Sequence, residues 1–336
     1  MQSSFWSSLQ IRFFWYHLNF FGAENVRIID VSTPIAYGKC HLPAAMNMHN
    51  TFFAARILHS QGGIRTLIER TAEDLGSIGI SNIDQIIIIA EDSLGTWGTA
   101  HRARLLLKAA SHQAPVYIVE GGNKTLLEAA SQTVNHQPIA ELNKTSYVPL
   151  LNTDLFTDKT EILGLLRNNK QQTFFADFRG NNLREITALD WAPIEIIEED
   201  KLILPDSFQG GRIPGSVILD HDIFFDENRN LKTKEQLEQI LLDGGFAPDQ
   251  RTICFCWKGL RASIIETVRE RVGWPSRNIR IFFEGMNDLL RDPDAKPLLD
   301  SRILDLRDKK NLEIFHPLIR EKVKRDFLTL SLSQHL

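Results

Sequence analysis

The fold-deciding stretch of this sequence is Cys256-Trp257-Lys258-Gly259-Leu260-Arg261. The residues before it, Arg251–Phe255, form a short, largely apolar run that predicts a buried parallel strand. The residues after it, 262–272, have a helix-forming composition and end at Gly273, a common helix stop. These six residues therefore connect a strand to a helix, and we expect their backbone amides to converge on one point.

The chemistry of this loop centres on Cys256. The positive end of the following helix and the cations Lys258 and Arg261 favour a thiolate over a thiol. Gly259 allows the loop to turn without placing a side chain at its centre. We therefore predict that Cys256 is a reactive nucleophile. Most free cysteines are small buried apolar side chains, and this is our interpretation of Cys254 in the preceding strand.

The composition is that of a globular protein. The chain has 336 residues, 43% of them hydrophobic and 24% charged, which is enough for two domains with separate cores. A net charge of −4 gives no basic surface for nucleic acid, and no stretch is apolar over the length of a membrane span. The three cysteines and ten histidines match no disulfide framework and no zinc spacing, so we predict no cofactor and no metal. A free thiolate fits a reducing, cytoplasmic location.

The chain contains two copies of one strand-and-helix unit. The copies share four segments in the same order, which are 26–31 with 173–178, 41–45 with 212–216, 80–90 with 246–256, and 116–121 with 280–285. Each copy also has a predicted helix between its last two segments, at 100–110 and at 262–272. Short strands that alternate with helices predict an α/β fold with a mostly parallel sheet in each copy, and ligands usually bind at the strand ends of such sheets.

The repeat sets the expected domain organisation. We expect an aromatic N-terminal arm at 1–22, a first domain at 23–135 that has no cysteine where the repeat predicts one, a linker at 136–160, a second domain with Cys256 at 161–302, and a charged helical tail at 303–336. We interpret the arm as a docking helix or interface arm, and residues 180–209 as a surface insertion in the second domain. His101 and Arg102 are interpreted as helix-start residues that face the linker.

The order of these motifs resembles that of the rhodanese sulfurtransferases. The order is an aspartate-ended strand, Gly-Arg-Ile-Pro-Gly at 211–215, a strand that leads into Cys-x-x-Gly-x-Arg, and a strand that ends in Glu-Gly. The duplication resembles the two-domain thiosulfate and 3-mercaptopyruvate sulfurtransferases over roughly 25–299. This resemblance implies tandem rhodanese-like domains with the catalytic cysteine in the second copy. The first copy has Ala90-Glu91-Asp92 at the corresponding place.

The resemblance also implies a mechanism. Cys256 would take a sulfane sulfur from a small anionic donor as a persulfide and pass it to cyanide, a thiol or a dithiol. The implied donor-binding residues are Arg179, Lys258 and Arg261, with Arg184 as a weaker candidate, and the loop around the persulfide includes Trp257, Gly259 and Leu260. Thiosulfate-type relatives have a lysine at the position of Lys258 and mercaptopyruvate-type relatives a serine, which favours thiosulfate as the donor.

Three positions depart from the family pattern and keep other functions open. Trp257 replaces an arginine of thiosulfate-type loops and is expected to line the mouth of the site. Arg261 stands where two-domain members have threonine, and Gly285-Met286-Asn287 replaces Gly-Ser-Trp. The alternatives are a 3-mercaptopyruvate sulfurtransferase, a sulfur carrier or regulatory binding module, and a Cdc25-like phosphatase or arsenate reductase. The last is less favoured because those loops are one residue longer, wide enough for a tetrahedral anion.

Overall fold

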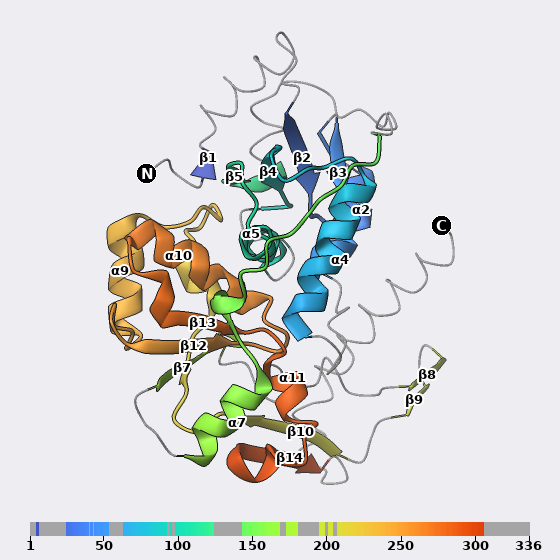
Figure 1. Cartoon of the computed structure of the whole chain (residues 1–336). Coiled ribbons are helices and arrows are strands. Elements are labelled where there is room, and N and C mark those ends of the chain that lie inside the picture. The colour runs from blue at the N-terminus through green and yellow to red at the C-terminus, as the bar shows by residue number, and fades with distance from the viewer. Residues whose placement is uncertain are drawn as a thin grey trace.

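The described residues of the computed structural model form two α/β units, each built on a five-stranded sheet (Figure 1). The structure describes residues 5–6, 25–39, 41–42, 44–53, 63–92, 95, 98–123, 143–168, 173–180, 195–198, 201–203 and 207–305. The predicted α/β class with two mostly parallel sheets is confirmed. Arg184 and Cys40, and most of the expected arm and tail, lie outside the described residues.

The first sheet has the strand order β1-β5-β4-β2-β3, and every neighbouring pair is parallel. Its strands are β1 (Phe5–Trp6), β2 (Val26–Asp30), β3 (Ala45–Asn47), β4 (Gln85–Ile89) and β5 (Val116–Val119). The helices of this unit are α2 (Pro34–Lys39), α3 (His49–Phe53), α4 (Gly63–Ser77) and α5 (Thr99–Ala109). The isoleucine run of β4 lies at the centre of the sheet, where both faces are covered and continuous apolar sequence is required.

The second sheet has the order β11-β7-β12-β13-β6 and is also parallel throughout. Its strands are β6 (Phe156–Thr157), β7 (Thr173–Asp177), β11 (Val217–Ile218), β12 (Arg251–Phe255) and β13 (Ile279–Phe282). The helices are α7 (Lys159–Arg167), α9 (Lys234–Asp243), α10 (Ile264–Val272) and α11 (Gly285–Leu289), with short 3-10 turns at η2 (Thr153–Leu155), η4 (His221–Phe224), η5 (Arg261–Ser263), η6 (Ser276–Asn278) and η7 (Lys296–Leu298).

The two sheets have the same strand order. The strands β1, β5, β4, β2 and β3 of the first sheet correspond, in that order, to β6, β13, β12, β7 and β11 of the second. Asp30 pairs with Ile89 as Asp177 pairs with Phe255, so the residue that follows β4, Ala90, corresponds to Cys256. The match extends to a positive φ of 62° at Ala44 and 71° at Gly215.

The structure corrects the alignment of the last repeated segment by one residue. The sequence motif paired Glu120-Gly121 with Glu284-Gly285. Strand pairing instead places Ile118 opposite Ile88 and Ile281 opposite Cys254, so Gly122 corresponds to Gly285. A shift of one residue in a strand turns each side chain to the other face, so this correction changes which residues face the site.

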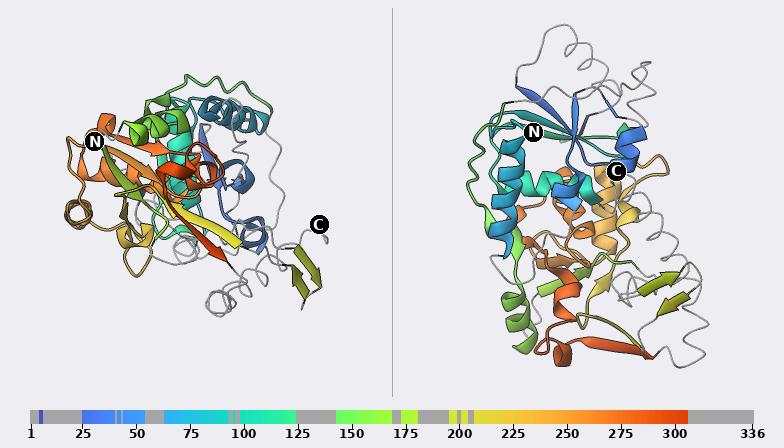
Figure 2. Two further views of the ribbon diagram at one scale, coloured as in Figure 1. Left: turned by 90° about the horizontal axis from the view of Figure 1, so that it is seen from below. Right: turned by 90° about the vertical axis from the view of Figure 1, so that its right-hand side faces the viewer.

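One edge strand of each sheet lies in a segment that the sequence assigned to the arm or the linker. β1 extends the first sheet with residues of segment 1–22, and β6 extends the second with residues of segment 136–160. Within the expected insertion, β8 (Glu195–Glu198) and β9 (Lys201–Ile203) form a hairpin that projects from both units (Figure 2). β10 (Ser207–Arg212) pairs with β14 (Asp300–Asp305), which includes the first residues of segment 303–336.

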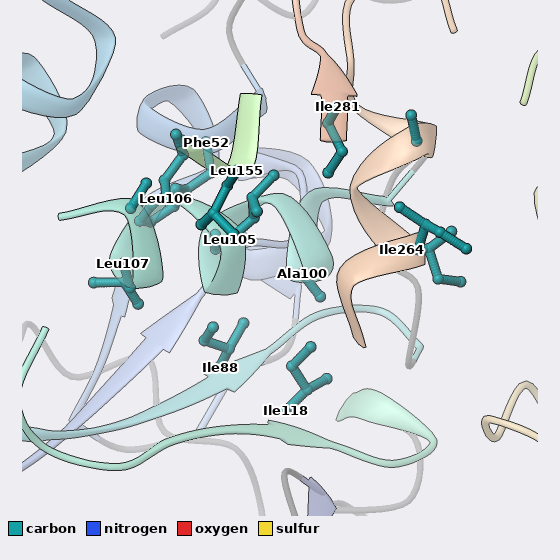
Figure 3. Packing of buried hydrophobic residues seen from close by; sticks show 14 of the residues in the cluster. Phe52, Ile88, Ala100, Leu105, Leu106, Leu107, Ile118, Leu155, Ile264 and Ile281 are labelled. Carbon is teal, nitrogen blue, oxygen red and sulfur yellow. The ribbon is translucent and has the colours of Figure 1, made fainter. Parts of the chain in front are cut away.

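One apolar core joins the two units through α5 and α10, which lie between the sheets. Figure 3 shows Phe52 and Ile88 of the first unit on the same cluster as Leu155 and Ile264 of the second. Each of these four side chains is at most 5% exposed. The units are therefore held together by burial of apolar surface, which fixes α5 against the second unit.

No helix in the part of the chain that the structure describes is both long and apolar enough to cross a membrane.

Candidate functional site

The cysteine loop begins at the carboxyl end of β12, the central strand of the second sheet. Cys256 follows Phe255 directly and is 1% exposed. The loop ends in η5, which leads into α10, and α10 ends at Gly273 with a φ of 85°. The predicted strand, loop and helix are thus present in that order, and the positive end of the helix lies next to the loop.

The carbonyl groups of the loop point outward, and each has a hydrogen-bond partner. The carbonyls of Cys256 and Trp257 accept from the backbone N–H groups of Met286 (2.9 Å) and Asn287 (3.2 Å) at the start of α11. Those of Gly259 and Leu260 accept from the Oγ (2.7 Å) and the backbone N–H (3.2 Å) of Ser263.

The fifth carbonyl, that of Lys258, accepts from Nη1 of Arg102 at 2.8 Å. In a trans peptide the N–H points opposite to the preceding C=O. The amides of 257–261 therefore turn toward the inside of the loop, as an anion-binding cradle requires.

Two glycines make this shape possible. Gly259 has a φ of 71°, and a Cβ there would lie 2.7 Å from the Cα of Phe283. Gly285 has a φ of 66°, and a Cβ there would lie 2.5 Å from the carbonyl oxygen of Cys256. Both positions combine a left-handed backbone with a close backbone approach, which only glycine tolerates. Gly285 is what allows α11 to approach the loop closely enough to bond its carbonyls.

Arg179 is 1% exposed and is bound within the protein. Its guanidinium pairs with the carboxylate of Asp177, with Nη2 to Oδ2 at 2.7 Å, and donates to the carbonyl of Gly211 at 2.8 Å. Its Cζ lies 4.7 Å from the centre of the Trp257 ring, a cation–π contact. The Asp177 carboxylate neutralises this cation, and a donor-binding role for Arg179 stays a prediction.

The expectation that Trp257 lines the mouth of the site is wrong. Its side chain belongs to a buried apolar cluster with Phe255 and Met286, and the residue is 3% exposed. The indole ring packs beneath the Arg179 guanidinium because a large aromatic ring gains more from burial than from solvent contact. Trp257 therefore supports the loop from its buried side and contacts almost no solvent at the site.

Lys258 and Arg261 remain with Cys256 on the loop. Burial and, to a lesser extent, the nearby cations Arg291 and Arg102 together lower the pKa of Lys258 to about 8. Arg261 is 6% exposed and donates from Nη1 to the carbonyl of Arg179 at 3.1 Å. Cys254 is fully buried, and this burial raises its thiol pKa, so its predicted role as a structural side chain agrees with its surroundings.

Arg102 is a site residue that the sequence interpretation missed. It lies on α5 of the first unit, is 3% exposed, and contacts the cysteine loop through Lys258. His101 is fully buried and hydrogen bonds to Thr267 of α10 at 3.0 Å. The expectation that these two residues face the linker is wrong, because this face of α5 packs against the second unit.

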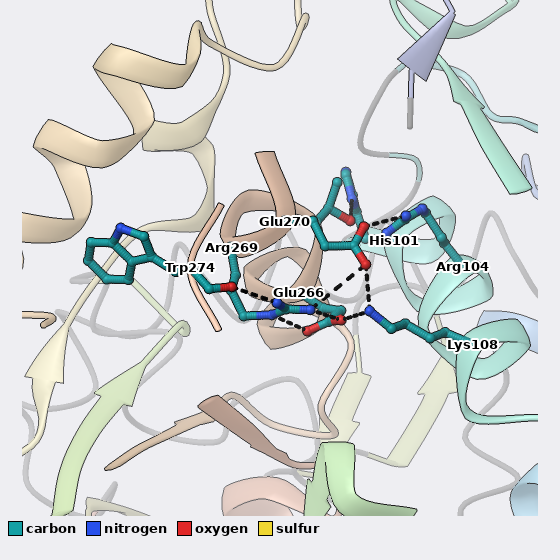
Figure 4. Close-up of polar contacts among 8 residues, drawn as sticks. His101, Arg104, Lys108, Glu266, Arg269, Glu270 and Trp274 are labelled. Carbon is teal, nitrogen blue, oxygen red and sulfur yellow. Dashed lines mark hydrogen bonds and ion pairs between the residues drawn. The ribbon is translucent and has the colours of Figure 1, made fainter. Parts of the chain in front are cut away.

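A complementary charge pattern on the two helices could have indicated this packing (Figure 4). Arg104 and Lys108 of α5 are four residues apart, as are Glu266 and Glu270 of α10. Arg104 pairs with Glu270 at 2.5 Å, and Lys108 pairs with both acids. Arg269 completes the network through Glu266, with Nε to Oε2 at 2.7 Å.

A possible cation-binding group lies near the loop, at the turn that follows β11. Potential ligand atoms of Asp220, His221 and Asp222 lie within 4.8 Å of one another. Asp222 already pairs with Arg229 at 2.9 Å, and the hydrogen bond from His221 lowers the pKa of Asp220 to about 2. Exposed acidic groups commonly occur without an ion, and the contacts with Arg229 and His221 account for the arrangement of these two aspartates.

The corresponding turn of the first unit carries Ala90 where the second unit has Cys256. There Oε1 of Glu91 accepts from the N–H of Thr33 at 2.8 Å, and the side chain of Asn123 bridges Asp30 and Ser32. Burial raises the pKa of Asp30. These polar groups bond to one another in part, since Oε2 of Glu91 is buried without a hydrogen-bond partner among the described residues. They are acidic or neutral where the second unit carries cations.

Comparison with known proteins places the chain among rhodanese folds. A family model described as a rhodanese-like domain matches residues 16–129. The wild-type structure of EanB aligns with a TM-score of 0.62 and 15% identity, over 84% of this chain and 67% of that chain. An enzyme of anaerobic ergothioneine biosynthesis from Chlorobium limicola, in complex with trimethyl histidine, gives 0.62 and 15%, over 84% and 68%.

A third solved structure matches over nearly its whole length. SseA from Escherichia coli, described as a 3-mercaptopyruvate sulfotransferase with a rhodanese fold, aligns with a TM-score of 0.61 and 16% identity, over 84% of this chain and 99% of that chain. No curated protein sequence matches the chain. At these identities the structural likeness shows a shared fold.

Proposed function

We propose that this chain, whose residues 16–129 match a rhodanese-like domain and whose fold is shared with rhodanese structures, is a sulfurtransferase whose second unit carries sulfur as a persulfide on Cys256. The observation that carries this proposal is the loop itself. Five outward carbonyls turn the amides of 257–261 inward around a buried cysteine, next to Lys258 and Arg261. Such a cradle stabilises a compact anion at the sulfur.

The proposed reaction has two steps at one sulfur atom. The Cys256 thiolate attacks the outer sulfur of thiosulfate, a new S–S bond forms, and the old one breaks as sulfite leaves with the electron pair. Cyanide or a thiolate then attacks the outer sulfur of the persulfide, and the Cys256 thiolate leaves. The amide cradle and Lys258 hold the negative charge in both steps. The chemistry fits a reducing, cytoplasmic location.

The donor assignment rests on Lys258, a cation suited to a small dianion. The competing donor is 3-mercaptopyruvate, which SseA is described as using and which is the second candidate here. An EanB structure is described as a cysteine persulfide with ergothioneine, which supports persulfide chemistry on this fold.

The test is thiocyanate formation from cyanide with thiosulfate and with 3-mercaptopyruvate as separate donors. We expect a higher kcat/KM with thiosulfate, no product with Cys256→Ser, and near wild-type activity with the matched control Cys254→Ser. Turnover with 3-mercaptopyruvate alone would overturn the donor assignment. Inactivity with both donors would overturn the sulfurtransferase proposal and direct attention to phosphate and arsenate chemistry.

A further inference from the structure

We propose that Arg102 of the first unit is a positioning residue of the Cys256 site, and that its buried guanidinium holds the loop and supplies positive charge that favours the anionic form of the cysteine. The first unit, which carries Ala90 at the position equivalent to Cys256, thus completes the site of the second. The sulfur chemistry at Cys256 rests on the proposed function, whereas the effect on the thiolate can be measured without any sulfur donor.

Helix α5 packs directly against the cysteine loop. Gly98, directly before α5, approaches the loop so closely that a Cβ there would lie 2.9 Å from the carbonyl oxygen of Leu260. One turn along the helix, Arg102 donates to the carbonyl of Lys258. Two of the five loop carbonyls therefore face the first unit, and α5 acts as a wall of the cradle.

Arg102 has no carboxylate partner among the described residues. Its Nε and Nη2 are buried and have no hydrogen-bond partner among the described residues, and none of the described acids forms an ion pair with it. By contrast, the buried Arg179 pairs with Asp177 at 2.7 Å, and Arg269 pairs with Glu266. A buried guanidinium without a counter-charge is costly, so a nearby anion is expected to offset it.

The anion that we expect to offset the charge of Arg102 is the thiolate of Cys256. Burial lowers the pKa of Arg102 to about 10, and the negative charge of Cys256 acts in the opposite direction. Arg102 is therefore a cation at neutral pH, and the loop whose Lys258 carbonyl it contacts carries Cys256, so we assign the offsetting anion to this cysteine. By reciprocity, the cation that the thiolate stabilises must also stabilise the thiolate.

The charge balance around Cys256 also favours a role for Arg102. Trp257 brings no charge to the loop, and Asp177 neutralises Arg179. Arg102 therefore adds a cation from outside the loop to those that remain. Within the part of the chain that the structure describes, the titratable and charged groups on the loop, in contact with it, or acting on its charged residues include Cys254, Lys258, Arg261, Arg291, Arg179, Asp177, Asp220 and Arg102.

The experiment is the pH dependence of Cys256 alkylation by iodoacetamide in the full chain, followed by mass spectrometry of the peptide that contains it. Arg102→Gln retains a donor for the Lys258 carbonyl but removes the charge, and Arg102→Lys retains the charge. Arg104→Gln is the matched control, because Arg104 lies on the same helix and also pairs across the two units. Thermal unfolding of each variant identifies those that fold, and Arg102→Met is a second neutral variant.

We expect the alkylation midpoint to rise by about 1 pH unit in a folded neutral variant of Arg102, to stay near wild type in Arg102→Lys, and to be unchanged in Arg104→Gln. An unchanged midpoint in a folded neutral variant would overturn the proposal and leave Arg102 as a structural hydrogen bond. A shifted midpoint in a chain that loads no sulfur would support this proposal and overturn only the proposed function.

Discussion

The turns that follow β4 and β12 share a backbone and differ in chemistry. The carbonyl of Ala90 accepts from the N–H of Asn123 at 2.7 Å, as that of Cys256 accepts from Met286 at 2.9 Å. A Cβ on Gly122 would lie 2.5 Å from the carbonyl oxygen of Ala90, the same distance as for Gly285 and Cys256. One frame of glycine and hydrogen bonds therefore supports a nucleophile in one unit and none in the other.

The side chains on this common frame decide what each turn can do. The first turn has Glu91, Asp92 and Asp30, which repel an anionic donor, and the second has Lys258 and Arg261. The fold alone therefore does not set the function, which lies in the residues placed on it. The first unit also contacts the cysteine loop through α5, where Arg102 donates to the carbonyl of Lys258.

The largest expected effect comes from breaking the common frame. Gly285→Ala and Gly122→Ala each force a side chain onto a carbonyl at positive φ, so we expect each to cost more than about 3 kcal/mol of unfolding free energy. Gly285→Ala should also abolish sulfur transfer in the folded fraction, and Gly122→Ala should leave it intact. Gly215→Ala, at a φ of 71° with no atom within 4 Å of the new Cβ, is the control for backbone strain alone. Equal loss of transfer in both frame variants would contradict separate roles for the two turns.

The next effect tests how the units are held together. Glu266 is 3% exposed and pairs with Arg269 and Lys108, so Glu266→Gln removes a buried negative charge and leaves Glu270 as the remaining acid for both cations. We expect a loss of about 2 kcal/mol in urea unfolding. The exposed pair of Arg65 and Glu69, 3.6 Å apart, provides the control, because Glu69→Gln should change stability by less than about 1 kcal/mol. Similar losses from both changes would argue against a buried network between α5 and α10.

A smaller effect concerns the cation of the active turn. Lys258→Met should lower kcat/KM for thiosulfate about tenfold, through loss of one charge contact to the donor. The Lys258 pKa of about 8 is below its ordinary value, so the ammonium loses its charge as pH rises through 8. The KM of wild type for thiosulfate should therefore rise above pH 8, and that of Lys258→Met should not. Parallel profiles for the two proteins would remove Lys258 from donor binding.

The same pKa shift has a consequence for stability. Between about pH 8 and the ordinary lysine pKa, the unfolded chain binds a proton at Lys258 that the folded chain does not. Stability therefore rises with pH over this window, and the unfavourable burial of the charged form is present in full below pH 8. Lys258→Met should remove this contribution to the pH dependence of thermal unfolding.

The smallest expected effect comes from placing a nucleophile on the inactive frame. Ala90→Cys supplies the thiol at the equivalent position, but Glu91, Asp92 and Asp30 disfavour the thiolate. We expect no sulfur on this new cysteine when the chain is treated with thiosulfate, as read by peptide mass spectrometry. Loading there at a rate similar to that of Cys256 would show that the backbone frame is sufficient and that the charges are secondary.

The sequence predicted the elements near the cysteine better than the contacts between the units. The apolar run 251–255 and the helical composition of 262–272 correspond to β12 and to η5 with α10, because local pattern and burial agree there. The register of segment 116–121 was wrong by one residue, since the Glu-Gly motif outweighed strand pairing, which a sequence does not display.

The interpretations of Arg102 and Trp257 failed for a related reason. The surroundings of Arg102 depend on how α5 docks onto the other unit, and those of Trp257 on which face of the loop packs against α11. Both are tertiary contacts between segments far apart in the sequence. The charges spaced four residues apart on α5 and α10 were the available signal for the first of them.

The most direct test of the account is to locate the sulfur that the chain acquires from a donor. After treatment with thiosulfate and rapid alkylation, peptide mass spectrometry would compare the peptides of all three cysteines. We predict a gain of about 32 Da on Cys256 alone, as expected for a persulfide on an activated cysteine, and its removal by cyanide. Sulfur on Cys254 or Cys40, or a gain that persists in Cys256→Ser, would contradict the assignment of the reaction to the loop of the second unit.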